Sequence, residues 1–272
     1  MNIFQALVLG IVQGLTEFLP VSSSGHLVIF QQIFHTDPGI ALTFDVALHC
    51  GTLIAVLFVY WKRVWEMIKR PFSKFPMFLI LGTVPTIIIT LLLKNAIEST
   101  YGGTGLLGPG FIFTGLVLIV AEKIGNGRKG IKEMTSADTL LIGIGQGIAL
   151  LPSISRSGMT ISTGLALGLE RGFAADYAFL LSIPAILGGM ALSAYDILKG
   201  DSAAVSTVGI APFAVGIIAA AIIGFLAIKV MLAAIKKMKM KYFAWYVIAL
   251  GALILIGQLF FKDAISWLGT GI

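Results

Sequence analysis

The sequence predicts an all-α polytopic membrane protein built as an inverted repeat, in which each half is one re-entrant helix hairpin followed by three transmembrane helices. Three observations lead to this fold class: long apolar segments with few charges, basic residues gathered in three loops, and a motif that recurs in the second half. Residues 1–272 are expected to form a single membrane domain. Repeat 1 covers about 1–125, with its re-entrant hairpin at 4–33, and repeat 2 covers about 135–265, with its hairpin at 138–168.

The composition indicates that most of the protein surface faces lipid. Of the 272 residues, 57% are hydrophobic and 12% are charged, and the mean hydropathy is +0.98. Since a soluble domain carries roughly 25% charged residues, the charges here are too few for a water-exposed surface. The formal net charge of +6 does not indicate nucleic-acid binding, because the basic residues lie in loops between apolar segments. Cys50 has no partner for an intrachain disulfide, because it is the single cysteine.

Eight apolar segments follow one another along the chain, and six of them are plausible helices across about 30 Å of hydrocarbon. The six expected spans are 41–61, 76–93, 106–121, 176–196, 209–232 and 243–261. The other two segments, 4–33 and 138–168, are broken by Pro and Ser-Gly clusters. A continuous spanning helix would not carry such a break at its centre, so we expect hairpins there.

Basic residues are concentrated in three of the gaps between apolar segments. They are Lys62, Arg63, Lys69, Arg70 and Lys74 in the first loop, Lys123, Arg128, Lys129 and Lys132 in the second, and Lys229, Lys236, Lys237, Lys239 and Lys241 in the third. The positive-inside rule places all three loops in the cytoplasm. Between the second and third loops the chain must therefore cross an even number of times, although three apolar segments lie there. We expect segment 138–168 to enter the membrane and return on the same side.

The two broken segments are related in sequence. Residues 9–25 match residues 142–158 without a gap, at an offset of 133 (143 − 10, from Gly143 and Gly10). The other identical pairs are Ile11 with Ile144, Gln13 with Gln146, Gly14 with Gly147, Ser22 with Ser155, Ser24 with Ser157 and Gly25 with Gly158. Three spans follow each hairpin, and because three is odd the halves have opposite orientation. Inverted repeats bring their broken helices face to face near the bilayer midplane, which predicts both termini outside the cytoplasm.

The first break combines a carboxylate and a histidine with a serine loop. Gln13 and Glu17 are four residues apart and share one helix face. Pro20 helps to end that helix, and a second short helix begins near His26. The loop between them contains Ser22, Ser23, Ser24 and Gly25. Non-helical backbone at membrane depth is tolerated only where it is buried in protein or lines a watery cavity, so this loop is expected to border a site.

The second break supplies a matching loop with a positive charge. Ser155, Arg156, Ser157 and Gly158 again open a helix. Helix N-termini with Ser and Gly bind phosphate, and a guanidinium makes two-pronged contact with phosphate oxygens. The two loops together predict an anion site, and a diphosphate suits this concentration of positive potential.

Glu17 and His26 indicate hydrolysis rather than simple binding of an anion. A carboxylate is unfavourable in a pure anion site, whereas in a hydrolytic site Glu17 can hold a divalent cation or act as a base. His26 can pass a proton to the leaving group. Two routes stay open: Ser23 or Ser24 attacks after activation by His26 or Glu17, or a metal-bound water attacks while the serines donate hydrogen bonds.

The two breaks resemble the undecaprenyl-diphosphate phosphatase family, also called the bacitracin-resistance protein family, and the resemblance covers essentially the whole chain. The matching motifs are Gln13-x3-Glu17-Phe-Leu-Pro-x-Ser-Ser-x-Gly-His26 and Ser155-Arg-Ser-Gly-x-Thr160-Ile-Ser. The resemblance implies removal of the terminal phosphate from a long polyisoprenyl diphosphate, with Mg²⁺ or Ca²⁺ as the cofactor. This reaction recycles the lipid carrier of cell-wall synthesis and gives bacitracin resistance. The implied location is the cell (inner) membrane, with the site opening on the outer face, and the sequence leaves open whether a homodimer forms.

Carried over to this chain, the resemblance suggests roles for residues of both breaks. The expected catalytic residues are Glu17, His26, Ser23 and Arg156; the expected metal ligands are Glu17 and Gln13; and the expected substrate-binding residues are Ser22, Ser24, Gly25, Ser155, Ser157, Gly158 and Thr160. Two positions depart from the family pattern. Many members have Glu where this chain has Gln13, which leaves one carboxylate fewer for the metal, and the second loop has Pro152-Ser153 where Pro-Gly is common.

Two other function classes share parts of this pattern. A secondary transporter or flippase for an anionic or polyprenyl-phosphate substrate has the same architecture, but its anion site does not need Glu17 and His26. Acid-phosphatase-like membrane phosphatases also use Ser-Gly-His and Ser-Arg fragments, but they need a Lys-rich motif upstream and a second His with an Asp downstream. No Lys precedes His26, and the other histidines are His35 and His49, so the sequence argues against that class.

Overall fold

The computed structural model confirms an all-α protein with six helices long enough to cross a membrane. It describes residues 1–101, 105–196, 208–237 and 240–260, and within these ranges the regular elements are helices, apart from one isolated bridge between Lys129 and Leu169. The six long apolar helices are α3 (Pro38–Val59), α5 (Lys74–Tyr101, apolar over Lys74–Leu92), α6 (Leu107–Ile124), α9 (Arg171–Asp196), α11 (Ile210–Lys236) and α12 (Met240–Phe260). They confirm the six expected spans, with ends that differ by a few residues. Lys239 of the third basic loop and the expected end of repeat 2 (261–265) lie outside the described residues.

The two broken segments form helix–loop–helix hairpins. The first consists of α1 (Ile3–Phe18) and α2 (Ser23–Ile33), and the second of α7 (Ser136–Ile148) and α8 (Arg156–Ala166). The two helices of each hairpin pack against each other. Both hairpins begin with a capping box, in which a polar side chain and the residue three positions later bond each other's backbone amide. The re-entrant course of each hairpin through a membrane stays a prediction of the sequence.

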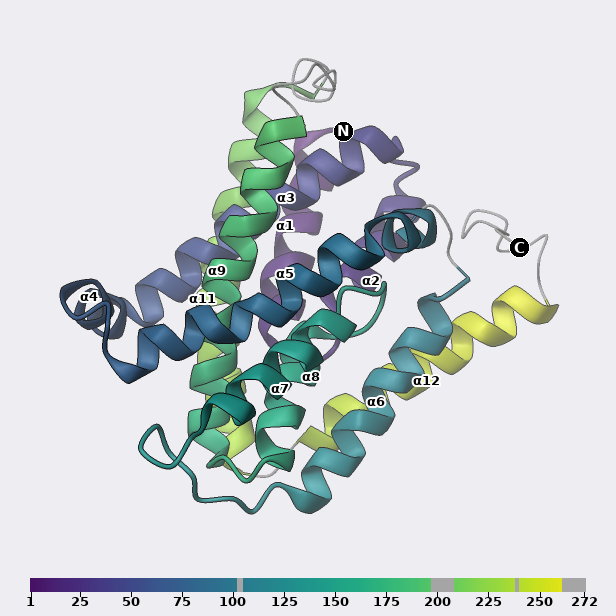
Figure 1. Cartoon of the computed structure of the whole chain (residues 1–272). Coiled ribbons are helices and arrows are strands. Elements are labelled where there is room, and N and C mark those ends of the chain that lie inside the picture. The colour runs from purple at the N-terminus through teal and green to yellow at the C-terminus, as the bar shows by residue number, and fades with distance from the viewer. Residues whose placement is uncertain (102–104, 197–207, 238–239, 261–272) are drawn as a thin grey trace.

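The two halves of the chain exchange packing partners. Helix α1 of the first half packs against α11 of the second, and α7 of the second half packs against α5 of the first (Figure 1). Glycines that are equivalent in the sequence repeat make these contacts: Gly10 lies against Gly216, and Gly143 lies against Gly82. Small residues allow helix backbones to approach closely in membranes. A two-fold relation between the halves would produce this exchange, and the inverted orientation itself stays a prediction.

Helices α6 and α12 run antiparallel as a pair along one side of the molecule (Figure 1). Gly108 near the start of α6 lies against Gly251 in the middle of α12, and Gly115 lies against Ala244 near the start of α12. The pair supports the first hairpin loop, because Val21 of that loop belongs to a buried cluster formed with residues of α6 and α12.

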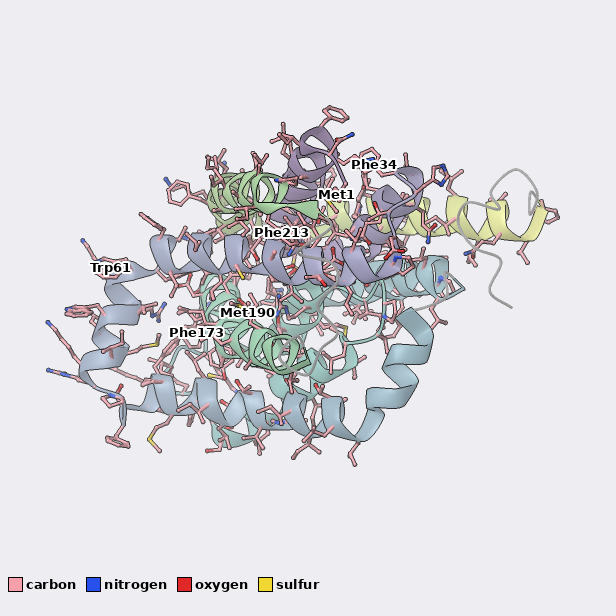
Figure 2. The ribbon with its side chains drawn as sticks, turned by 90° about the horizontal axis from the view of Figure 1, so that it is seen from above. Met1, Phe34, Trp61, Phe173, Met190 and Phe213 are labelled. Carbon is pink, nitrogen blue, oxygen red and sulfur yellow. The ribbon has the colours of Figure 1, made fainter. Side chains whose placement is uncertain are left out.

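A short helix that the sequence reasoning did not anticipate follows α3. Helix α4 (Trp61–Lys69) exposes Trp61 and Trp65, two of the aromatic residues typical of a membrane interface. Figure 2 shows Trp61 at the outer edge of the molecule. Arg63 of α4 pairs with Asp176 of α9 at 3.0 Å, and Tyr60 donates to the same carboxylate at 2.7 Å. These contacts fasten α4 to the core of the protein.

Replacing Gly10 by alanine should weaken the crossing of α1 and α11. The added Cβ would lie 2.5 Å from the backbone oxygen of Gly216, and overpacking of this kind costs about 1–3 kcal/mol. Thermal unfolding of the purified protein in detergent should therefore show a lower Tm. The matched control is Gly188→Ala in α9, where a Cβ meets no atom within 4 Å. Equal Tm values for the two variants would contradict this packing.

Candidate active site

Each hairpin loop ends in a serine that caps the helix after it. Ser22 accepts a hydrogen bond from the Gly25 amide at 3.4 Å, and Ser155 accepts one from the Gly158 amide at 3.1 Å. In both loops the hydroxyl of the serine two positions later lies close to the capping hydroxyl, at 3.3 and 3.2 Å. The two loops that match in sequence therefore have the same two side-chain contacts. The sequence repeat encodes two helix starts of the kind that capping serines favour.

The caps leave other backbone groups available to an anion. The amides of Gly25 and Gly158 are occupied by their capping serines. Within the described part of the chain, the amides of Ser23 and Arg156, the first residues of α2 and α8, have no hydrogen-bond partner. Gly25 also has a packing role, because a Cβ there would lie 2.5 Å from the Phe111 ring. The first turns of α2 and α8 can thus receive a phosphate through their leading amides.

An ion pair joins the two hairpins. Glu17, near the end of α1, is 7% exposed, and its Oε1 accepts a hydrogen bond from Nη2 of Arg156 at the start of α8. Beside it, the Ser157 hydroxyl donates to the Leu19 carbonyl at 3.1 Å. A buried carboxylate without a partner is costly. The ion pair therefore requires the two loops to lie side by side.

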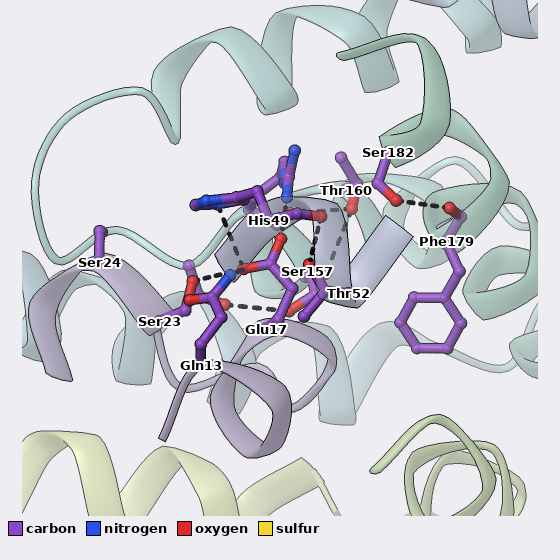
Figure 3. A network of polar contacts seen from close by, with 12 residues as sticks. Gln13, Glu17, Ser23, Ser24, His49, Thr52, Ser157, Thr160, Phe179 and Ser182 are labelled. Atoms are coloured by element: carbon purple, nitrogen blue, oxygen red, sulfur yellow. Dashed lines mark hydrogen bonds and ion pairs between the residues drawn. The ribbon is translucent and has the colours of Figure 1, made fainter. Parts of the chain in front are cut away.

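The second oxygen of Glu17 is surrounded by three polar side chains. The Ser23 hydroxyl donates to Oε2 at 2.5 Å, and the Gln13 Nε2 donates to it at 3.1 Å. The Nε2 of His49, from α3, lies 3.7 Å from the same oxygen. Figure 3 shows these side chains gathered around Glu17. One carboxylate thus connects α1, α2, α3 and α8.

The partners of Glu17 follow the repeat in position but not in chemistry. Ser23 and Arg156 are equivalent residues (156 − 23 = 133), and they bind the two oxygens of the same carboxylate. The position equivalent to Glu17 is Leu150 (17 + 133 = 150). Gln146, the counterpart of Gln13, instead donates to a threonine of α5 at 3.0 Å. The site is therefore asymmetric and contains the carboxylate of the first half alone.

His49 is the site residue that the sequence reasoning missed. It lies within the expected span 41–61, outside both motifs. The signal that could have found it is its presence inside an apolar helix, since ionisable residues within spanning helices are usually functional. Its Nδ1 lies 2.7 Å from the Asp45 carbonyl oxygen, and the Thr52 hydroxyl donates to the His49 carbonyl oxygen at 3.0 Å.

His26 lies on a different side of the α2 start. Its Nδ1 is 2.7 Å from the Ser22 carbonyl oxygen, and its Nε2 is 2.7 Å from the Tyr246 hydroxyl of α12. The ring also packs edge-on against Phe111 of α6. Among the described residues, its hydrogen bonds go to the first loop and α12, and none goes to Glu17. The structure thus places the two expected acid–base groups in separate hydrogen-bonding environments.

The remaining expected binding residue supports the second loop. The Thr160 hydroxyl donates to the Arg156 carbonyl at 2.8 Å and is buried. A cavity of about 10 Å³ borders the ion pair and is lined by Glu17, Phe18, Arg156, Ser157, Ala178, Phe179 and Ser182. This space is no larger than one water needs. Entry of a phosphate between the loops therefore requires side chains to move.

Comparison with known proteins places the chain in a family. The family model described as "Bacitracin resistance protein BacA" matches residues 6–253. The chain belongs to this family. The protein named "Undecaprenyl-diphosphatase" of Carboxydothermus hydrogenoformans is 45% identical over 95% of this chain and 98% of its own. "Undecaprenyl-diphosphatase 3" of Bacillus cereus is 43% identical over 95% of this chain and 98% of its own length. "Undecaprenyl-diphosphatase" of Methanosphaera stadtmanae is 38% identical over 94% of this chain and 98% of its own length. The resemblance inferred from the two motifs is confirmed.

For this member of the bacitracin resistance family, the polar atoms beside Glu17 suit a divalent cation. Gln13 is fully buried, and its Oε1 has no hydrogen-bond partner among the described residues. That oxygen and Glu17 Oε2 are the hard ligands that Mg²⁺ and Ca²⁺ prefer, and Mg²⁺ commonly uses one or two carboxylates together with substrate phosphates. The described residues hold no cluster of three or more His, Cys, Asp or Glu able to bind a metal. A divalent cation bound by Glu17 and Gln13 would therefore need further oxygen ligands from substrate or water.

In this bacitracin resistance family member, Glu17 and Arg156 should stabilise the fold as a pair. Arg156→Gln leaves the buried Glu17 carboxylate without its partner, a change that costs about 3–5 kcal/mol in buried pairs, and Glu17→Gln leaves the part-exposed Arg156 unpaired, which costs less. We expect a lower Tm in each single variant and a smaller loss in the double variant than the two losses added. Thermal unfolding of all four proteins forms the double-mutant cycle. Additive losses would contradict a coupled pair.

Proposed function

We propose that this protein hydrolyses undecaprenyl diphosphate to undecaprenyl phosphate and inorganic phosphate, recycling the lipid carrier of cell-wall synthesis and conferring bacitracin resistance. The observation that carries the proposal is the Glu17 carboxylate, held between Ser23 and Arg156 at the starts of two helices. Relatives matched over nearly their whole length bear the name of this activity. These names favour hydrolysis over transport or lipid flipping.

Arg156 and the two helix starts bind the terminal phosphate in this proposal. The guanidinium now bonds to Glu17 Oε1, and phosphate oxygens can replace that carboxylate oxygen as its acceptor. The available amides of Ser23 and Arg156 and the positive ends of both helix dipoles favour the same negative charge. The hydroxyls of Ser24, Ser157 and Thr160 are proposed to help bind the substrate. Binding thus frees one oxygen of Glu17 at the moment the phosphate arrives.

Ser23 is the proposed nucleophile, with Glu17 as its general base. The Ser23 hydroxyl already donates to Glu17 Oε2 at 2.5 Å, so the carboxylate can take the proton as the oxygen attacks the terminal phosphorus. Undecaprenyl phosphate leaves as the anhydride P–O bond breaks. Water then hydrolyses the phosphoserine, releasing inorganic phosphate and restoring the serine. In the other open route, water attacks directly and Ser23 donates a hydrogen bond.

His26 and a divalent cation complete the proposed chemistry. His26 keeps the role expected from its side-chain chemistry, proton transfer to the leaving phosphate, and its Nε2 contacts the Tyr246 hydroxyl. Glu17 and Gln13 are the residues that would hold Mg²⁺ or Ca²⁺. When bound, the cation would neutralise negative charge on the diphosphate oxygens.

The six apolar helices make this an integral, multi-pass membrane protein. We propose the cell (inner) membrane, with the three basic loops in the cytoplasm and both termini on the outer face, where the site opens. The distribution of Lys and Arg supports this orientation. The lipid bilayer and the polyisoprenyl diphosphate are the proposed partners, and a homodimer stays an open alternative to a monomer.

Phosphate release from undecaprenyl diphosphate tests the proposed reaction directly. Purified protein in detergent with Mg²⁺ or Ca²⁺ should release phosphate, and Ser23→Ala, Glu17→Gln and Arg156→Ala should each lower kcat/KM by about 10²-fold or more, since each removes a reacting or charge-stabilising group. Ser73→Ala, in the exposed loop between α4 and α5, is the matched control and should keep full activity.

The outcomes separate the routes and the rival function. Undiminished release in Glu17→Gln or Arg156→Ala would overturn the site assignment. A Ser23→Ala variant with near-normal kcat would remove the serine as nucleophile and favour attack by water. Absence of release from the unchanged protein would favour transport.

Cysteine labelling in intact cells tests the proposed orientation. In a Cys50→Ala background, a cysteine at position 2 should react with a membrane-impermeant maleimide, and a cysteine at Lys132 in the second basic loop should react only after the membrane is opened. The reverse pattern would place the termini in the cytoplasm and refute the orientation.

A further inference from the structure

We propose that His49 is a third protein ligand of the divalent cation, binding through Nε2 beside Glu17 and Gln13. The proposal rests on the proposed function in one respect, that a cation acts at this site. It assigns a metal role to a residue outside both sequence motifs.

The hydrogen bond of His49 to the backbone determines which ring nitrogen carries the proton. Nδ1 lies 2.7 Å from the Asp45 carbonyl oxygen. A carbonyl can only accept, so Nδ1 carries the hydrogen and Nε2 of the neutral ring presents its lone pair. Metal-binding histidines commonly donate their second nitrogen to a carbonyl in this way, which fixes the tautomer and the ring orientation. The Thr52 hydroxyl bonds to the carbonyl of His49 and holds the same turn of α3.

The lone pair of His49 faces another acceptor. Nε2 lies 3.7 Å from Glu17 Oε2, and two acceptors at this distance attract each other only through a proton or a cation between them. The other oxygen of Glu17, Oε1, is bound to the Arg156 guanidinium. The carboxylate oxygen that faces His49 is therefore Oε2. Gln13 bonds to the same carboxylate and has a buried oxygen with no partner among the described residues. Gln13, Glu17 and His49, the side chains of α1 and α3 that can each supply a ligand atom, therefore meet at the Glu17 carboxylate.

The ligand types indicate which cations this site prefers. Glu17 supplies a carboxylate at this point, and Gln13 offers an amide oxygen. An imidazole nitrogen as the third ligand suits Mn²⁺, Co²⁺ or Zn²⁺, whereas Ca²⁺ prefers oxygen ligands alone. With His49 as a ligand, the site should select Mn²⁺ over Ca²⁺ more strongly than an all-oxygen site would.

Electron spin-echo spectroscopy of bound Mn²⁺ tests this assignment without relying on activity. The full-length protein in detergent, loaded with Mn²⁺ alone, should show the ¹⁴N coupling of a directly bound imidazole. His49→Gln, which offers an oxygen of similar reach, should lose this coupling. His35→Gln and His26→Gln replace the other two histidines and should keep it. Competition titrations should show the preference for Mn²⁺ over Ca²⁺ falling by about tenfold in His49→Gln.

Each outcome bears on the ligand assignment separately from the phosphatase activity. No ¹⁴N coupling in the unchanged protein, coupling that survives His49→Gln, or coupling lost in His26→Gln instead would overturn it. A protein that releases phosphate but lacks the coupling retains the proposed function and rejects His49 as a ligand. In that case a protonated His49 paired with Glu17 accounts for the contact. Coupling from His49 in a protein that hydrolyses no diphosphate supports the ligand and refutes the proposed function.

Discussion

The part-buried ion pair between Glu17 and Arg156 is the interaction on which the site depends. It joins the end of α1 to the start of α8, residues 139 positions apart. The Glu17 carboxylate is buried and costly to leave unpaired, so the pair holds the two hairpin loops together. In the proposed reaction the same pairing keeps Glu17 available for chemistry, because an arriving phosphate can replace it at the guanidinium. Under this proposal, one contact links the stability of the fold to recognition of the substrate.

Close helix packing brings these loops within reach of each other. Gly10 and Gly143, equivalent in the repeat, let α1 and α7 lie directly against α11 and α5 of the opposite halves. Lipid offers no hydrophobic driving force between helices, so such contacts must come from close van der Waals fit. The serine caps then set the start of each second helix. The two hairpins therefore have the same backbone arrangement, formed by equivalent glycine contacts and serine caps.

The functional side chains of the site, in contrast, differ between the two halves. Ser23 and Arg156 occupy equivalent places at the two helix starts, yet one supplies a hydroxyl and the other a guanidinium to a single carboxylate. Leu150 stands where a second carboxylate would lie. In the proposed mechanism the repeat provides two equivalent helix starts for the anion, and its side chains divide the roles of base, nucleophile and phosphate binder.

The sequence by itself determined the all-α membrane fold, the six spans and the residues of both loops, because hydropathy, basic loops and capping serines are local signals. It also placed Glu17 near Arg156, because the repeat implied facing loops. Only the tertiary structure decided that His49 joins Glu17 while His26 turns toward Tyr246. Each of those contacts depends on how α3 and α12 pack against the hairpins. The spacing of residues along the chain does not predict this packing, because a shift of one helical turn between two helices gives a side chain a different neighbour.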